Sequence, residues 1–153
     1  MRLLKLLLVL FVCAAGPAVA GPFEDGVVAY GNGDYATALR LWRPLAEQGN
    51  AGAQTNLGVM YDLGNGVPQD YTTVVSWLQK AADQGYALAQ GRLARMYQRG
   101  RGVPQDYVEA HKWFNLAGAQ DEFFVSERDS IAAKMTPAQL AEAQKMAREW
   151  KPK

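Results

Sequence analysis

Few side chains in this sequence are suited to catalysis or to metal binding. His111 is the only histidine and Cys13 the only cysteine. No Ser-His-Asp or Cys-His arrangement can be assigned, and the carboxylates lack the spacing of a calcium-binding loop. His111 lies two positions before Trp113 in a helical pattern, so we expect a partly exposed helix residue rather than a general base. The sequence therefore predicts no catalytic residue, no metal site and no cofactor.

The charged side chains that stand out are four arginines close together in the chain. Arg92, Arg95 and Arg99 are three and four positions apart, so they share one stripe of a helix, and Arg101 follows shortly after. The planar guanidinium group suits bidentate pairing with carboxylates. Two interpretations remain open: the stripe is a solvated helix face, or it binds carboxylates of an acidic protein or peptide.

Two glycine-rich tripeptides invite comparison with phosphate-binding loops. Residues 64–66 read Gly-Asn-Gly and residues 100–102 read Gly-Arg-Gly. Neither is followed by the lysine and Ser/Thr of a nucleotide-binding P-loop. We interpret both as turns between helices.

A 36-residue repeat supplies the elements that must position the arginines. Residues 53–84 and 89–120 are identical at 15 of 32 aligned positions, whereas chance gives about two at average residue frequencies. A third, degenerate copy lies upstream, in which Asp34 matches the pattern but Trp42 falls one position late. Repeats of this length are single supersecondary units that stack to bury a shared core.

The arginine stripe is not part of the repeat pattern. In the preceding unit the positions equivalent to its three helical members are Asn56, Val59 and Leu63. The repeat fold therefore does not demand arginine there, which is compatible with a role in binding as well as with a solvated helix face. The candidate partner-binding residues are Asn56, Arg92, Arg95, Arg99 and Arg101.

Each unit is predicted to be a helix–turn–helix. Apolar residues over about 51–63 recur at spacings of three and four, which marks one buried helix face. Gly64 ends this helix because glycine readily takes the left-handed conformation, and Asp70 is placed to cap the next one. The second helix runs to Gly85. Trp77 and its counterpart in the next unit are expected in the core between helices.

The chain after residue 120 departs from the repeat. Residues 121–135 are predicted to hold a short helix, and residues 138–150 an amphipathic one whose apolar face, with Leu140 and Trp150, turns toward the repeats. Such a helix suits the cap of a repeat array. The predicted fold is all-α: a short right-handed α-solenoid of stacked helix–turn–helix units with C-terminal capping helices over 121–153.

The repeat resembles the Sel1-like repeat family, a group of tetratricopeptide-like α-solenoids. The resemblance covers about residues 23–120, as one degenerate unit (23–50) and two full ones (51–86 and 87–120). It implies a curved scaffold for protein–protein interaction, often in bacterial envelopes, secretion or stress signalling, with the first helix of each unit on the concave, ligand-facing side. The matching residues are Leu57, Gly58, Tyr61, Gly64, Gly66, Val67, Asp70, Trp77, Ala81, Ala82 and Gly85.

Residues 1–20 predict a cleavable export signal. Arg2 and Lys5 precede an apolar run over residues 6–15, and a small-x-small pattern ends at Ala20. The apolar run is shorter than the roughly 20 residues of a membrane span. We therefore expect a periplasmic or secreted protein, cleaved after Ala20 and without stable membrane insertion.

Charge and composition narrow the partners further. A formal net charge of +1 and the lack of a dense Lys/Arg tract argue against general nucleic-acid binding. A protein or peptide partner is the main interpretation, and two alternatives stay open. Cysteine-rich exported relatives have been linked with binding or hydrolysing β-lactams, but this chain loses its one cysteine with the signal. A cell-wall glycan binder would use Trp42, Trp77 and Trp113.

Overall fold

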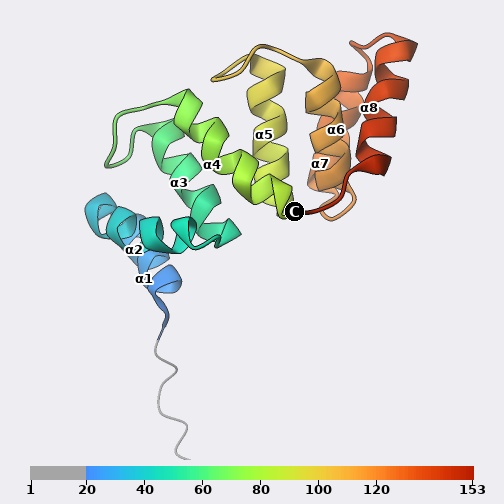
Figure 1. The fold of residues 1–153 in the computed structure, drawn as a ribbon. Coiled ribbons are helices and arrows are strands. Elements are labelled where there is room, and N and C mark those ends of the chain that lie inside the picture. The colour runs from blue at the N-terminus through green and yellow to red at the C-terminus, as the bar shows by residue number, and fades with distance from the viewer. Residues whose placement is uncertain (1–19) are drawn as a thin grey trace, which may run out of the picture.

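The computed structural model describes residues 20–153, and Figure 1 shows that this part of the chain is built from helices. The predicted export signal lies outside the described residues, apart from Ala20. Along the described chain the helices are α1 (Pro22–Gly31), α2 (Tyr35–Glu47), α3 (Ala51–Leu63), α4 (Tyr71–Asp83), α5 (Ala87–Arg99), α6 (Tyr107–Gly118), α7 (Phe123–Ala132) and α8 (Pro137–Glu149).

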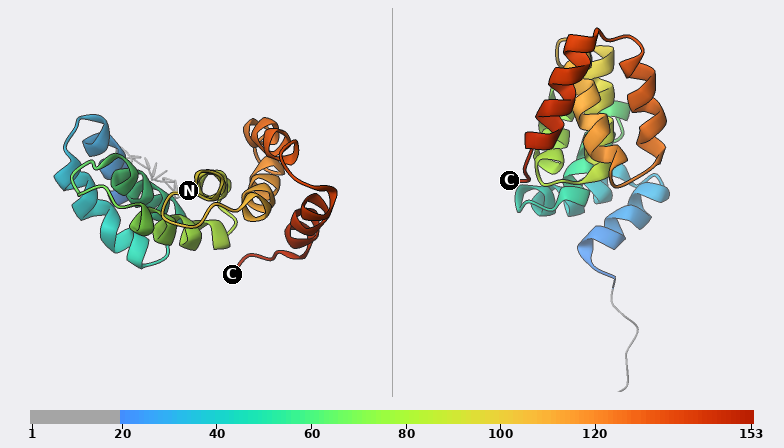
Figure 2. Two further views of the ribbon diagram at one scale, coloured as in Figure 1. Left: turned by 90° about the horizontal axis from the view of Figure 1, so that it is seen from above. Right: turned by 90° about the vertical axis from the view of Figure 1, so that its right-hand side faces the viewer.

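The helices pack in sequential pairs that stack on one another. α1 packs on α2, α3 on α4 and α5 on α6, while α2 with α3 and α4 with α5 join successive pairs. The pairs follow one another in a curved array, seen from two further sides in Figure 2. α7 and α8 both pack on α6 and end the array. The all-α solenoid with C-terminal helices is confirmed.

The helix ends follow the local signals of the sequence. Asp34, Asp70 and Asp106 each precede a second helix, and each accepts a hydrogen bond from a backbone N–H of the first turn at 2.8 to 3.0 Å. Gly64 and Gly100 end α3 and α5 in the left-handed conformation, with φ of +68° and +64°. These caps satisfy backbone groups that a helix end leaves unpaired.

The second glycine of each turn allows one unit to rest on the preceding one. Gly66 has φ of +73°, and a Cβ there would lie 2.8 Å from the Cβ of Tyr35. Gly102 has φ of +71°, and a Cβ there would lie 2.2 Å from the carbonyl oxygen of Tyr71. Each turn therefore packs against the start of the second helix one unit earlier, which explains why the Gly-x-Gly pattern repeats.

A repeated glutamine joins adjacent units through the core. Gln54 is 4% exposed; its Nε2 donates to the Ala46 carbonyl oxygen at 3.0 Å, and its Oε1 accepts from Gln84 at 2.9 Å. Gln90, which is fully buried, makes the equivalent two hydrogen bonds one unit later, at 3.2 and 3.3 Å. We call these two residues and their partners the glutamine ladder. A buried amide needs such partners because leaving it unpaired costs free energy.

The tryptophans occupy two different environments. Trp113 is buried, as predicted, and so is Trp42, whose indole N–H donates to the Phe23 carbonyl oxygen at 3.1 Å. Gly26 permits this, since a Cβ there would lie 2.3 Å from the Trp42 indole nitrogen. The prediction for Trp77 was only partly right: it is half-buried at the edge of the core that the buried residues of α2 and α3 form, and the Lys80 ammonium lies 4.4 Å from its ring centroid.

The C-terminal segment closes the last unit. Phe124 of α7 packs against Gly91, where a Cβ would clash with its ring. Trp150, at the end of α8, meets Trp113 edge-on with ring centroids 6.2 Å apart. The chain then returns to α4, where Lys153 donates its backbone N–H to the Asp83 carbonyl oxygen at 2.8 Å. The C-terminus accordingly lies near the lower ends of α4 and α5 in Figure 1.

Candidate partner-binding groove

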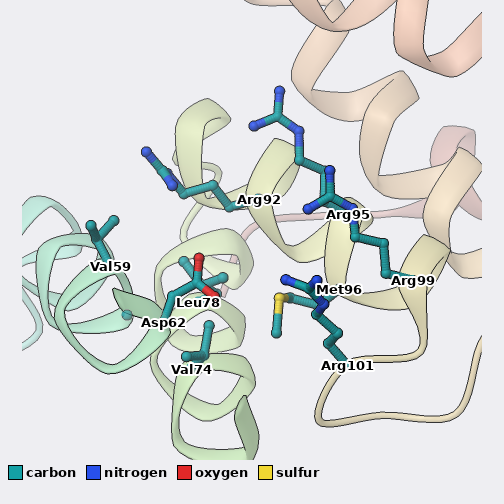
Figure 3. A pocket seen from close by; sticks show the side chains of 10 residues that line it. Val59, Asp62, Val74, Leu78, Arg92, Arg95, Met96, Arg99 and Arg101 are labelled. Atoms are coloured by element: carbon teal, nitrogen blue, oxygen red, sulfur yellow. The ribbon is translucent and has the colours of Figure 1, made fainter. Parts of the chain in front are cut away.

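A groove of about 110 Å³ lies between α3, α4 and α5, and all four predicted arginines line it. In Figure 3 they lie on one side, with Val59 and Asp62 on the facing helix. We call this cavity the arginine groove. The residues that line it are Gly58, Val59 and Asp62 of α3, Val74 and Leu78 of α4, Arg92, Arg95, Met96 and Arg99 of α5, and Arg101 of the following turn.

The helix geometry of α5 places the arginines together. Leu93 and Met96 are buried in the core, so the arginines interspersed between them emerge along the edge of the buried face. Gly100 then turns the chain, and the Arg101 guanidinium lies over the ring of Tyr71 at 5.3 Å from its centroid. This cation–π contact positions the fourth arginine beside the other three.

Arg92 has an unmet hydrogen bond. Its Nε is buried and has no acceptor among residues 20–153. Burial lowers the pKa of Arg92, the neighbouring Arg95 adds to that, and Asp62 across the groove opposes it. The side chain nevertheless stays charged at neutral pH. A carboxylate entering the groove would supply the missing acceptor and would add to the negative charge of Asp62, which alone faces several arginines.

Arg95 differs from the other three arginines. Its Nε donates to Glu127 Oε2 at 3.0 Å and its Nη2 to Oε1 at 2.5 Å, so a carboxylate of α7 already occupies the guanidinium fork. No such pair within 4.0 Å is present for Arg92, Arg99 or Arg101 in the described part of the chain. In the predicted stripe, therefore, three arginines are free to bind a carboxylate, and Arg95 instead links α5 to α7.

Asn56 lies in a neighbouring cavity. This cavity has a volume of about 140 Å³ and is lined by Val27 and Tyr30 of α1, Trp42 of α2, and Asn56 and Val59 of α3. We call it the apolar pocket. Val59 lines both cavities, so they adjoin along α3. Sequence reasoning missed the apolar pocket because its residues come from the degenerate first unit and from α3 together.

The expectation of a partly exposed His111 was wrong. The side chain is 3% exposed, and its Nδ1 is buried without a hydrogen-bond partner among the described residues. α7 and α8 pack over this part of α6, where His111 lines a third cavity with Arg128 and Arg148. Burial lowers the pKa of His111, and the positive charge of Arg128 adds to the effect. The positions equivalent to His111 in the two earlier units hold the apolar residues Leu39 and Val75, so the repeat pattern indicated that this position is buried.

Three further observations concern glycan binding, metal binding and membrane insertion. Trp42 and Trp113 are 3% and 2% exposed, so neither offers an open ring face for stacking on a sugar. Within residues 20–153, the His, Cys, Asp and Glu side chains form no group of three that could hold a metal ion. None of the described helices combines the length and apolar character that crossing a membrane requires.

Comparisons with known proteins agree with this architecture. Of the solved structures, an SLR-fold protective antigen present in uropathogenic Escherichia coli strains matches with a TM-score of 0.81 and 31% identity, over 84% of this chain and 29% of that one. A Sel1 repeat protein from Oxalobacter formigenes matches with a TM-score of 0.69 and 30% identity, over 73% of this chain and 46% of that one. The chain therefore spans less than half the length of either protein.

No curated protein matches the sequence. The family model described as "Sel1 repeat" matches residues 23–50, 51–86 and 87–122. Repeats of this family typically serve as protein-interaction scaffolds rather than catalysts. Three consecutive matches cover well over half of the described chain, and the chain belongs to the Sel1 repeat family.

Proposed function

We propose that this protein is an exported scaffold that binds an acidic segment of a partner protein in the arginine groove. The observation that carries the proposal is the unpartnered Nε of Arg92, in a cavity that Arg99 and Arg101 also line without a carboxylate partner in the described chain. An acidic side chain or a chain-terminal carboxylate matches these donors in charge and in geometry.

Contacts of this kind contribute measurably to affinity. A hydrogen bond to a charged group contributes about 1.5–3 kcal/mol. Each contact of that size changes the dissociation constant by about ten- to a hundredfold. One carboxylate held by two arginines thus contributes about 3–6 kcal/mol before the cost of association, so further contacts with the partner are needed for tight binding.

Export rests on the N-terminal sequence. The positive residues, the apolar run and the small residues before Gly21 form the pattern read by signal peptidase. We infer a location in the bacterial envelope or outside the cell, where the partner must also be found. Fractionation of cells that express the full chain tests this inference, and an unprocessed chain confined to the cytoplasm contradicts it.

The binding proposal is tested by affinity capture from an envelope extract with three forms of the protein. The first is wild type, and the second, the groove variant, carries Arg92→Glu, Arg99→Glu and Arg101→Glu. The third carries Arg40→Glu, Lys134→Glu and Lys151→Glu at exposed positions outside the groove, so its net charge changes by the same amount. Arg95 is left unchanged because it holds α7.

We expect wild type and the charge-matched control to retain a common partner and the groove variant to lose it. Circular dichroism should show that all three forms are equally helical. A partner retained by the groove variant would place the binding site elsewhere on the solenoid. If the wild-type protein captured no protein from the envelope extract, the scaffold proposal itself would be contradicted.

A further inference from the structure

The apolar pocket beside the arginine groove has the size of one bulky side chain. Its volume is about 140 Å³, and a protein cavity of about 150 Å³ is enough to bind benzene. Its walls are fixed: Tyr30 packs between Tyr35 and Trp42 with ring centroids 5.2 and 5.7 Å apart, and its hydroxyl accepts from Asn65 at 2.8 Å. The pocket is thus preformed for a Leu- or Phe-sized group.

The pocket is also open to an incoming chain. Val27, at its rim on α1, is 49% exposed although it is a large apolar residue. Covering such a surface is favourable by about 25 cal/mol per Å². Since the neighbouring cavity is basic, the two together present an apolar site next to a cationic one.

The separation of the two sites follows from α3. Asn56 and Val59 of α3 line the apolar pocket, and Gly58, Val59 and Asp62 line the arginine groove. The outermost of these residues, Asn56 and Asp62, lie on one stripe of the helix and are six residues apart, so the two sites extend over about 9 Å of α3 at 1.5 Å per residue. An extended polyproline-II chain advances about 3.1 Å per residue and repeats its side-chain direction every three residues. Side chains three positions apart on such a chain are therefore about 9 Å apart on one face.

The far side of the groove limits how the chain can lie. Arg95 and Arg99 line both the arginine groove and a fourth hollow formed with Glu127 and two serines of α7. Glu127 already occupies the guanidinium fork of Arg95 there, so that arginine is not free to bind a further carboxylate on this side. The bound chain is accordingly favoured to continue from the arginines toward α1, where the apolar pocket lies.

We propose that the groove recognises an extended segment with a bulky apolar side chain and a carboxylate three residues apart. The apolar side chain enters the apolar pocket, and the carboxylate accepts hydrogen bonds from Arg92 and its neighbours. This inference rests on the proposed function, to which it adds the apolar site and the spacing. The sequence pattern it predicts is Phe-x-x-Glu or the reverse order, in a segment that favours the extended conformation.

The experiment measures binding of fluorescein-labelled, proline-rich eight-residue peptides to purified protein expressed as the full chain. Two peptides carry Phe and Glu three positions apart, one in each order. Three controls replace Phe by Ser, replace Glu by Gln, or place Phe and Glu side by side. Fluorescence anisotropy gives the dissociation constant of each. We expect one of the two orders to bind at least tenfold more tightly than every control, because the Ser control lacks the buried Phe side chain, the Gln control lacks the charged acceptor, and the adjacent pair cannot reach both sites together.

Two protein variants locate the apolar site. Val27→Asp introduces a charge at the rim of the pocket, whereas Val28→Asp makes the same change at the adjacent, 62% exposed position that does not line it. Val27→Asp should weaken the Phe-containing peptide about tenfold and leave the Ser control unchanged, so that the two effects are not additive. Val28→Asp should have no effect on either peptide.

The outcomes separate this inference from the proposed function. If Glu→Gln in the peptide weakens binding but Phe→Ser and Val27→Asp do not, the acidic partner stands and the two-site inference is overturned. Equal binding of the adjacent Phe-Glu peptide would overturn the three-residue spacing. If no peptide binds in a Glu-dependent way, the proposed function fails together with it.

Discussion

Replacing Gln90 by glutamate tests whether the glutamine ladder holds the units together. Gln90 is fully buried, with 0% of its surface exposed. Its Nε2 donates a hydrogen bond to the Ala82 carbonyl oxygen, and its Oε1 accepts one from Gln120. Glutamate has nearly the same shape, so packing is preserved and only the charge changes. A carboxylate buried there loses its hydration and meets the Ala82 carbonyl oxygen, which cannot donate to it.

The cost of Gln90→Glu is expected to depend on pH. Burial raises the pKa of a carboxyl group, and a shift of two to three units from about 4.3 corresponds to about 3–4 kcal/mol. A group whose pKa is raised in the folded state binds more protons there than in the unfolded chain. The penalty is therefore absent below about pH 4.3 and grows as the pH rises through the window up to the folded pKa. The protonated side chain can again donate to Ala82.

Urea denaturation followed by circular dichroism at pH 5.0 and pH 7.5 measures this effect. Gln90→Glu should lose about 3 kcal/mol or more relative to wild type at pH 7.5, and clearly less at pH 5.0. Gln54→Glu provides a replicate in the preceding unit, where the same contacts occur. Gln139→Glu, at an exposed capping position, should stay within about 0.5 kcal/mol. If Gln90→Glu matched that control at both pH values, the ladder would not be a buried tie between units.

Two further predictions concern the core and the last unit. Trp113→Ala should lower the free energy of unfolding by about 3–5 kcal/mol as a core truncation. Trp113→Phe should cost less than Trp42→Phe, because the Trp42 indole N–H donates to Phe23 whereas the Trp113 indole N–H has no partner in the described chain. Urea denaturation ranks the variants, and the reverse order would contradict the hydrogen-bond argument. Burial lowers the pKa of His111, so its unfolded state binds more protons and stability is lost as the pH falls below about 6.5. His111→Val should reduce the loss of thermal stability between pH 7.5 and pH 5.5, and an unchanged pH profile would refute this.

The repeat and its helix boundaries could be predicted because local rules determine them. Asp70 and Asp106 cap helices through side-chain oxygens two and three residues from their partners, and Gly64 and Gly100 end helices by their own backbone freedom. Such interactions depend only on neighbours in the chain. A period of 36 residues then fixes the stacking, since each unit must cover the apolar face of the next.

The glutamine ladder could not be predicted from residue type alone. Gln54 and Gln90 are polar, and polarity usually indicates exposure. Their burial follows from hydrogen bonds to a carbonyl eight residues earlier and to a side chain 30 residues later. Trp42 is a related case, because a shifted position still reaches the core when Gly26 makes room for the indole. Both depend on how two helices meet, which periodicity does not specify.

The same limit applies to the arginine stripe. Helical spacing predicted one stripe for Arg92, Arg95 and Arg99, and all three line one cavity, but the spacing did not distinguish them. Arg95 is paired with Glu127, which lies 32 residues later in α7 and outside the repeat. No pattern within the repeat predicts the pair of Arg95 and Glu127, because α7 has no counterpart in the earlier units.

A departure from the repeat pattern is by itself an ambiguous signal of function. His111 differs in residue type from Leu39 and Val75 at the equivalent repeat positions, as Arg92 differs from Asn56, yet the two side chains have different environments. Each lines a cavity and keeps one buried nitrogen without a hydrogen-bond partner among the described residues. They differ in charge: burial lowers the pKa of His111, which favours its neutral form, whereas Arg92 stays charged beside other arginines that lack a carboxylate partner. Within the arginine stripe, what separates a binding residue from a structural one is whether the fold itself supplies a carboxylate. Arg95 is satisfied by Glu127 and Arg92 is not, so recognition of a partner is expected to depend on Arg92 and its unpaired neighbours, with Arg95 holding the wall in place.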